Sequence, residues 1–541
     1  MRYLKTLLFF IVFFSVVQAF AQTPDIILTH GKIFTSNMKQ PYVEAVAIKG
    51  NKIVAVGNNT AIGKLAGATT KKINLDGKTV VPGFNDAHYH HNPYYAGYTI
   101  PFPEDGSEPS WQQLKDSISS AVSQQPRGSF IYATMGVDVG TDTSINRHVL
   151  DQLAPAHPLL IGAYWGHVTY FNTAAIKALG ISETEPDIKG GFLGRFPGTN
   201  QLNGRAYEHA GTWLQMKKPG NEALFLASLN DLGKQAVYFG VTSIQNMCTG
   251  ASPGQFISML KKQPLPIRFR TISWGEISRD GKLLIPGASQ KNIPNQSLVT
   301  RSGTKWLLDG TPIERLAWYS TEYKDQPGWK GGLDFSKQDV RRILAELSQR
   351  KDQPMFHVVG DSTIDFMLQE LGKSPATWKN RRVRFEHGDG LLPASYAKAK
   401  KLGIIVVQNP SHFTIVPVLN QRYGTMLLQH AESVKSLLNA GIPVALGSDG
   451  PLNPFLNIMF ACMHPFRPSE ALTVEEAVIA YTKTSAYAEM QDNKGMIAPG
   501  QLADLAVLTN DIFTMPLQQL PATHSVLTMV NGKIVYNTLQ E

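Results

Sequence analysis

The chain has 541 residues, of which 43% are hydrophobic and two are cysteines. This length is ample for a large core and for two or three domains, and two cysteines exclude a disulfide scaffold. The formal net charge is +9, but the basic residues form no block of the kind that binds nucleic acid. The composition therefore predicts a globular protein with a mildly basic surface and no nucleic-acid partner.

The first 21 residues have the pattern of a secretory signal peptide. Arg2 and Lys5 precede the apolar run 7–17, and the run 19–21 has small residues at both cleavage-determining positions. The apolar run is short for a membrane span of about 20 residues, so an uncleaved anchor is the less favoured interpretation. We expect an exported protein, periplasmic or secreted, without a membrane partner after the signal is removed.

Both ends of the mature chain are rich in short β-strand patterns. Residues 22–78 contain alternating runs around a Gly50-Asn51 turn, and residues 496–541 contain similar runs around Asn531-Gly532. Two β-rich ends around one long middle predict a small composite β-sandwich. Its N-terminal part is expected at 22–78 and its C-terminal part at 496–541.

The middle of the chain, residues 79–495, alternates short apolar runs with helical patterns such as 340–347. Eight strand candidates joined by crossovers predict an α/β fold, a (β/α)8 TIM barrel. An insertion at about 92–236 separates the first candidate from the second and is expected to cover the barrel mouth. The strand candidates are 79–83, 241–246, 267–272, 305–308, 355–359, 383–386, 404–408 and 444–447.

Metal-ligating residue types recur at the predicted C-terminal ends of these strands, where such barrels carry their reactive side chains. A strand alternates its side chains, so the motif His88-Tyr89-His90 points both imidazoles to one side, at a separation that one metal ion can bridge. Four imidazoles, a carboxylate and a lysine on one rim suit an ion of the Zn²⁺ type. These candidate ligands are His88, His90, Lys305, His357, His387 and Asp449.

The lysine is the unusual member of this set. A free ammonium with a pKa of about 10.4 would repel a cation, so Lys305 fits a metal site only if it is deprotonated or converted by carbon dioxide into a carbamate. A carbamate has two anionic oxygens and can bridge two metal ions. The expected cofactor is therefore a divalent metal, preferably Zn²⁺, at one or two ions per chain, with a carbamate on Lys305 if there are two.

These motifs together resemble the amidohydrolase superfamily, and more closely its branch of N-substituted formamide deformylase and YtcJ-like hydrolases. The resemblance covers nearly the whole mature chain. It rests on VVPGFNDAHYH at 80–90, TKWLLDG at 304–310, HVVGD at 357–361, the Glu386-His387 pair, VALGSDG at 444–450 and GMIAPGQLADL at 495–505.

The resemblance implies a binuclear centre. His88 and His90 would hold the more buried ion together with Asp449, His357 and His387 would hold the exposed ion, and carbamylated Lys305 would bridge them. Asp449 would also act as the catalytic base, taking a proton from the attacking water and delivering it to the leaving nitrogen. Such metals lower the pKa of water and polarise a carbonyl, and the carboxylate is the general base.

Three further residues are candidates for substrate binding. His167 lies in a segment that resembles one near the substrate in this family, although a structural histidine is an equal alternative. Glu208 is a weaker candidate, because a surface salt bridge would explain it as well. His412 ends the run 408–412, which is one residue longer than the family's usual pattern. The tyrosines that follow His90 suggest an aromatic pocket, or loop packing alone.

The leading prediction is a metal-dependent amidohydrolase that cleaves a non-peptide carbon–nitrogen bond of a small amide-type substrate. A deaminase or an ester or lactone hydrolase on the same scaffold is the alternative among enzymes. A catalytically silent secreted binding protein is the alternative from another class; it predicts the loss of a ligand or of the base, and neither is missing. Paired barrels are common in the family, so a homodimer is compatible with the sequence.

Overall fold

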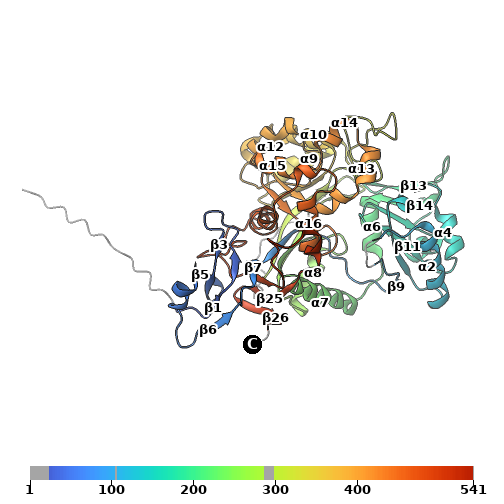
Figure 1. Ribbon diagram of the computed structural model, residues 1–541. Coiled ribbons are helices and arrows are strands. Elements are labelled where there is room, and N and C mark those ends of the chain that lie inside the picture. Colours follow the sequence, from blue (N-terminus) through green and yellow to red (C-terminus); the bar gives the residue numbers. More distant parts are fainter. Residues whose placement is uncertain (1–22, 104–106, 286–297, 540–541) are drawn as a thin grey trace, which may run out of the picture.

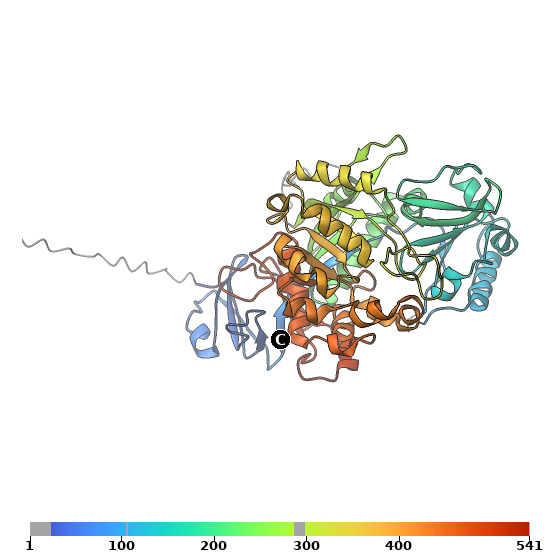
Figure 2. The same cartoon turned by 90° about the horizontal axis from the view of Figure 1, so that it is seen from above.

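The computed structural model describes residues 23–103, 107–285 and 298–539, and the expected signal peptide lies outside them. The chain forms three bodies in a row (Figures 1 and 2): a β-sandwich at one end, a barrel in the middle and the inserted region at the other end. No helix in the described ranges is long and apolar enough to cross a membrane.

The central body is the predicted (β/α)8 barrel, formed by one eight-stranded parallel sheet. In sheet order its strands are β8 (Phe84–Tyr89), β15 (Val241–Met247), β16 (Arg268–Trp274), β19 (Val299–Leu307), β20 (Pro354–Val358), β21 (Arg384–His387), β22 (Ile405–Gln408) and β23 (Val444–Leu446). The helices that follow these strands are α7 (Glu222–Tyr238), α8 (Pro253–Lys262), α9 (Lys337–Ser348), α10 (Asp361–Leu371), α12 (Tyr396–Leu402), α15 (Val434–Asn439) and α16 (Pro454–Met463).

Helix α9 illustrates how the sequence directs the outer layer. Ser336 caps its first turn by accepting a hydrogen bond from the Asp339 N–H, and Val340, Ile343 and Leu347 recur at helical spacing and are fully buried. This apolar stripe packs into the main hydrophobic core, which lies between the strands and the helices. The helical pattern at 340–347 is therefore confirmed.

The barrel closes between its first and last strands, where the metal-ligand candidates of β8 lie. The Asp449 N–H donates to the His88 carbonyl at 2.9 Å, and Asp86 accepts from the N–H groups of His88 and Ser448 at 3.1 and 3.0 Å. Gly447 permits this approach, because a Cβ there would lie 2.4 Å from the His88 nitrogen. Close contact of the two strand ends brings His88 next to Asp449.

The predicted first barrel strand was wrong in position. Residues 79–83 largely form β7 (Thr79–Pro82), which pairs with β2 (Lys32–Phe34) and β24 (Leu505–Leu508) in the sandwich. The barrel strand β8 begins immediately after Gly83, where a Cβ would collide with Thr242 at 2.2 Å. Both runs are buried and apolar, so the hydrophobic pattern does not mark where the chain leaves one sheet for the other.

The composite β-sandwich contains strands from both ends of the chain, as expected. Hydrophobic side chains from its two sheets share one core. One sheet has the order β5 (Lys52–Gly57), β4 (Ala45–Lys49), β1 (Ile26–Thr29) and β6 (Lys71–Asn74), and the other β26 (Lys533–Asn537), β25 (Ser525–Val530), β24, β7, β2 and β3 (Tyr42–Val43). The turns at Gly50-Asn51 and Asn531-Gly532 join antiparallel pairs.

The insertion is built around its own six-stranded sheet, with buried clusters of apolar side chains. Its strand order is β13 (Gly191–Arg195), β14 (Leu202–Glu208), β12 (Val168–Phe171), β11 (Leu159–Ala163), β10 (Ile131–Met135) and β9 (Tyr98–Thr99), with helices α2 (Trp111–Gln124), α4 (Arg147–Leu153), α5 (Thr173–Ala178) and α6 (His209–Lys217). The predicted insertion, 92–236, also included most of helix α7. This helix packs on β15 of the barrel and β25 of the sandwich rather than on the inserted sheet.

Candidate metal centre

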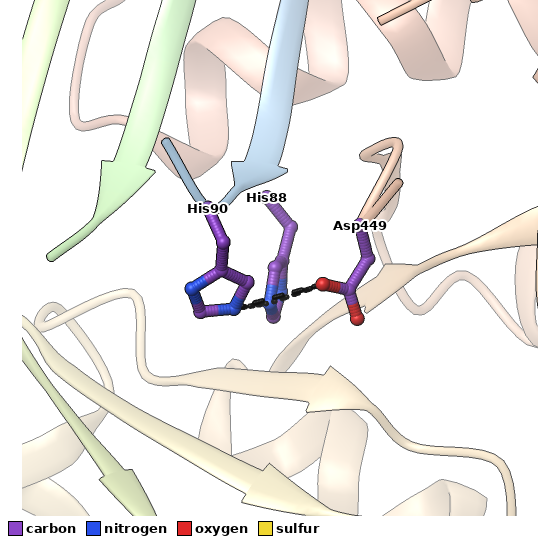
Figure 3. A group of neighbouring side chains, drawn as sticks. All are labelled: His88, His90 and Asp449. Carbon is purple, nitrogen blue, oxygen red and sulfur yellow. Dashed lines mark hydrogen bonds and ion pairs between the residues drawn. The ribbon is translucent and has the colours of Figure 1, made fainter. Parts of the chain in front are cut away.

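His88 and His90 lie at the C-terminal end of β8, and their side chains converge with Asp449 beyond β23 (Figure 3). Their Nε2 atoms are 3.2 Å apart, and both lie within 3.7 Å of Asp449 Oδ1. Potential ligand atoms of the three residues all lie within 4.8 Å of one another. His88 and His90 thus point to one side, as strand alternation predicted, and form a compact group of three residues with Asp449.

Hydrogen bonds on the far side of each ring determine which nitrogen faces this group. His88 Nδ1 donates to the Glu386 carboxylate at 2.7 Å, and His90 Nδ1 donates to the Met247 carbonyl at 3.0 Å. Both Nε2 atoms are then unprotonated, because a neutral imidazole carries one proton. Two lone pairs that face each other at 3.2 Å cannot hydrogen-bond, and a cation between them satisfies both.

Glu386 is held in place as an acceptor for His88. Arg384 lies two residues earlier on β21 and donates two hydrogen bonds to Glu386, at 2.7 and 2.9 Å, with both side chains fully buried. Burial opposes ionisation of Glu386, but Arg384, His88 and Lys305 together outweigh it and lower the pKa of the carboxyl to about 2. This charged pair fixes the orientation of the His88 ring.

Lys305 reaches the same point from β19. Its Nζ lies 3.0 Å from His88 Nε2 and 5.8 Å from the centre of the Trp274 ring. The residue is 1% exposed, and burial lowers the pKa of its amine to about 8. Lys305 is therefore a buried group beside His88 rather than a solvated surface charge.

His357 and His387 come from the neighbouring strands β20 and β21, and their ring centres are 4.4 Å apart. Burial holds the pKa of both imidazoles well below the usual range, so both are neutral, as metal ligands must be. His357 Nε2 and His387 Nδ1 are buried and have no hydrogen-bond partner among the described residues. An unpaired buried nitrogen is costly, and a bound cation satisfies it.

Asp449 connects the two halves of the centre. One carboxylate oxygen faces His88 and His90, and the other lies 3.9 Å from His387 Nδ1. Although burial opposes ionisation, His88, His90 and Lys305 hold the pKa of Asp449 below its usual range. Asp449 and His387 both have positive φ, at 43° and 67°, a conformation that costs free energy and concentrates at functional sites.

His412 joins the exposed side of this centre. Its ring stacks on His387 with centres 4.8 Å apart, and its Nδ1 donates to Asp389 at 3.0 Å. Burial favours the neutral ring, but the Asp389 carboxylate outweighs it and raises the pKa of His412 to about 9. The residue lies on the short 3-10 helix Pro410–Thr414 rather than on a strand. The longer segment therefore still delivers this imidazole to the centre.

The insertion contributes His167 and Glu208 to the same pocket. Glu208 ends β14, and its carboxylate lies 2.5 Å from His167 Nδ1, just before β12. The His167 ring centre is 5.0 Å from that of His357. Glu208 is 2% exposed, so the surface salt bridge considered from the sequence is wrong. Burial and the neighbouring Glu314 raise the pKa of Glu208 well above its usual range.

A cavity of about 550 Å³ lies between the barrel mouth and the insertion, and the site residues that line it are His90, His167, Glu208, Lys305, His357, His387 and Asp449. This volume lies within the range of about 300–1,000 Å³ typical of small-molecule sites. The insertion side of the cavity includes Tyr95, Tyr132 and Lys218. Of the tyrosines after His90, Tyr95 lines it, whereas Tyr94 is exposed and donates to Asp231.

Comparison with known proteins identifies the family. Residues 71–536 match the amidohydrolase family. The chain belongs to the amidohydrolase family. The match runs through the barrel, the insertion and part of the β-sandwich, so it is not confined to one motif or one domain. The amidohydrolase superfamily predicted from the sequence is thereby confirmed, and the chain is a hydrolase of carbon–nitrogen bonds other than peptide bonds.

Three proteins are similar to this amidohydrolase over most of its length. Protein LONG AFTER FAR-RED 3 of Arabidopsis thaliana is 26% identical over 95% of this chain and 91% of its own length. N-substituted formamide deformylase of Arthrobacter pascens is 25% identical over 95% and 99%. A solved metal-dependent hydrolase from Pyrococcus horikoshii shares the fold, with a TM-score of 0.65, 17% identity and coverage of 91% and 99%.

Other polar residues of the amidohydrolase motifs have supporting roles. Asp309 accepts four hydrogen bonds, among them those of the Val359 and Gly360 N–H groups, and Asp361 pairs with Ser320. The pairing of Glu386 with His88 was not expected from the sequence. Arg384 and Glu386 have strand spacing i, i+2, which places them on one face and is the signal that could have revealed this support.

Proposed function

We propose that this amidohydrolase hydrolyses a small amide-type substrate at a divalent metal centre held by His88, His90, Lys305, His357, His387 and Asp449. The observation that carries the proposal is the convergence of imidazole nitrogens, two of which have no hydrogen-bond partner among the described residues. His357 Nε2 and His387 Nδ1 are buried and unpaired within the described part of the chain, and the Nε2 atoms of His88 and His90 face each other. Imidazoles, a carboxylate and a carbamate suit Zn²⁺.

A bound divalent ion supplies Lewis-acid chemistry, polarising the scissile carbonyl and lowering the pKa of water. Asp449 is ionised and faces both halves of the centre, so it accepts the proton of the attacking water. It then delivers that proton to the leaving nitrogen, which departs as the neutral amine. His412 stacks on His387, and the His167 ring lies beside His357; we assign to His412 and to the His167–Glu208 pair the positioning of the substrate carbonyl.

Lys305 lies beside His88, and we propose that it bridges the two halves of the centre. Its Nζ is 3.0 Å from His88 Nε2, and the residue is buried. A carbamate on this nitrogen would provide two anionic oxygens, one for each ion. We therefore propose two ions per chain when carbon dioxide is available.

The test combines metal analysis with a substrate panel. Protein reconstituted with zinc in the presence of bicarbonate should contain two ions per chain and hydrolyse at least one N-formyl or N-acyl amine. Removal of the metal with a chelator should abolish this activity, and zinc should restore it. A Lys305→Met variant should lose the dependence of metal content on bicarbonate.

Aryl esters, lactones and amino-substituted heterocycles in the same assays separate the proposal from its alternatives. Preferential release of ammonia from a heterocycle would indicate a deaminase, and preferential ester cleavage an esterase. A metal content of one ion per chain, unchanged by bicarbonate, would contradict the bridging role of Lys305. Activity that persists in metal-free protein would contradict the proposed chemistry altogether.

A further inference from the structure

The cavity in front of the metal centre extends into the insertion and includes a lysine that the chemistry above does not use. Lys218 caps the C-terminal end of α6, and its side chain lines the cavity. Its ammonium lies 4.9 Å from the ring centre of Tyr95 and 5.1 Å from that of Tyr132. Two aromatic faces thus hold a cation at the insertion side of the pocket.

This cation has no carboxylate partner among the described residues. Burial alone lowers the pKa of Lys218, to about 8, so the side chain remains charged at neutral pH. The buried Lys494 provides the contrast, because its ammonium pairs with Glu489 at 2.6 Å. The two acidic side chains that line the cavity, Glu208 and Asp449, face histidines instead. Lys218 is partly exposed to the cavity, so an anionic group of a bound molecule can reach its ammonium.

We propose that Lys218, Tyr95 and Tyr132 form a subsite for a carboxylate of the substrate, which is then an amide that carries an acidic group away from the scissile bond. This inference rests on the proposed function. The tyrosine rings would contact the apolar part of the substrate, and the ammonium would bind the carboxylate.

A carboxylate fits this subsite better than a phosphate. Lys218 is a single point charge, whereas phosphate sites usually combine an arginine fork or several backbone N–H groups. The end of α6 at which Lys218 lies is its C-terminus, whose partial negative charge disfavours a dianion. The subsite therefore favours a singly charged group.

The first test is kinetic and uses ω-formylamino alkanoates of increasing chain length with their primary amides as neutral counterparts. At the chain length that spans the cavity, the wild-type protein should prefer the acid in kcat/KM by about 10- to 100-fold, as expected for a hydrogen bond to a charged group. Lys218→Met should abolish this preference. Lys217→Met is the matched control, since Lys217 is an exposed neighbour over the Trp213 ring, and it should keep the preference.

The second test does not depend on hydrolysis. Calorimetry on zinc-loaded protein would compare 4-phenylbutanoate with the neutral alcohol 4-phenylbutan-1-ol, and the wild-type protein should bind the acid more tightly by the same factor. Lys218→Met and Lys218→Gln should lose this difference, with thermal unfolding confirming that both variants are folded. A preference that persists without Lys218 would place the carboxylate at the metals and overturn the subsite, as would no preference in the wild type.

The two tests also separate this inference from the proposed function. Hydrolysis of formylamides without any preference for acids would retain the function and refute the subsite. A Lys218-dependent preference in calorimetry, with no amide hydrolysed, would retain the subsite and refute the function.

Discussion

The two walls of the active-site cavity are built in different ways. The barrel wall takes its histidines, lysine and aspartate from the ends of strands in one parallel sheet, each within a short motif. The insertion wall takes Tyr95 from a loop, Tyr132 from β10 and Lys218 from the end of α6. Strand register in the barrel sheet groups the first set, whereas the second is grouped by the separate fold of the insertion. We expect substitutions in the barrel wall to affect the reaction itself and substitutions in the insertion wall to affect substrate choice.

The largest effect is expected for Asp449→Asn, because the amide cannot accept the proton of the attacking water. The value of kcat for the best panel substrate should fall by about 10²–10⁴-fold. Steady-state kinetics measures this, with metal analysis of the same samples. Asp492→Asn, at a side chain that is 71% exposed, serves as the control. Wild-type turnover in Asp449→Asn would remove this residue from the role of base.

A smaller loss is expected for Glu386→Gln, which touches no substrate but supports His88. A neutral amide holds the ring less firmly, and such partners of metal ligands are typically worth about 10–100-fold in metal affinity or activity. Competition with a chromogenic chelator measures the affinity. Glu370→Gln serves as the control. Glu370 lies on α10, and its carboxylate pairs with the exposed side chains of Arg341 and Lys373. Equal metal affinity in both variants would mean that the Glu386–His88 bond contributes nothing.

The smallest effect is expected in the insertion wall, for His167→Ala. Loss of one hydrogen bond to the substrate should lower kcat/KM by about 2- to 10-fold and leave metal content unchanged. The fall should appear mainly in KM if His167 positions the substrate. Loss of metal from this variant would instead make His167 a ligand and would erase the distinction between the two walls.

Much of the barrel wall could be predicted from the sequence, because its information is local. Strand alternation relates His88 to His90, and the parallel sheet brings the ends of successive strands to one rim. The wrong assignment of residues 79–83 to the barrel also comes from relying on local pattern. A buried apolar run has the same pattern in the sandwich and in the barrel. Periodicity describes how a strand is buried but not which sheet it joins.

The sequence by itself determined the barrel, the composite sandwich, the family and the candidate metal-binding residues. Only the tertiary structure decided that Glu386 supports His88, that Glu208 is buried against His167, and that Lys218 lies in the pocket over two tyrosine rings. The first group depends on spacing within a strand and on the repeat of strand and helix. The second depends on distances between segments remote along the chain, which are fixed only when the barrel and the insertion each fold.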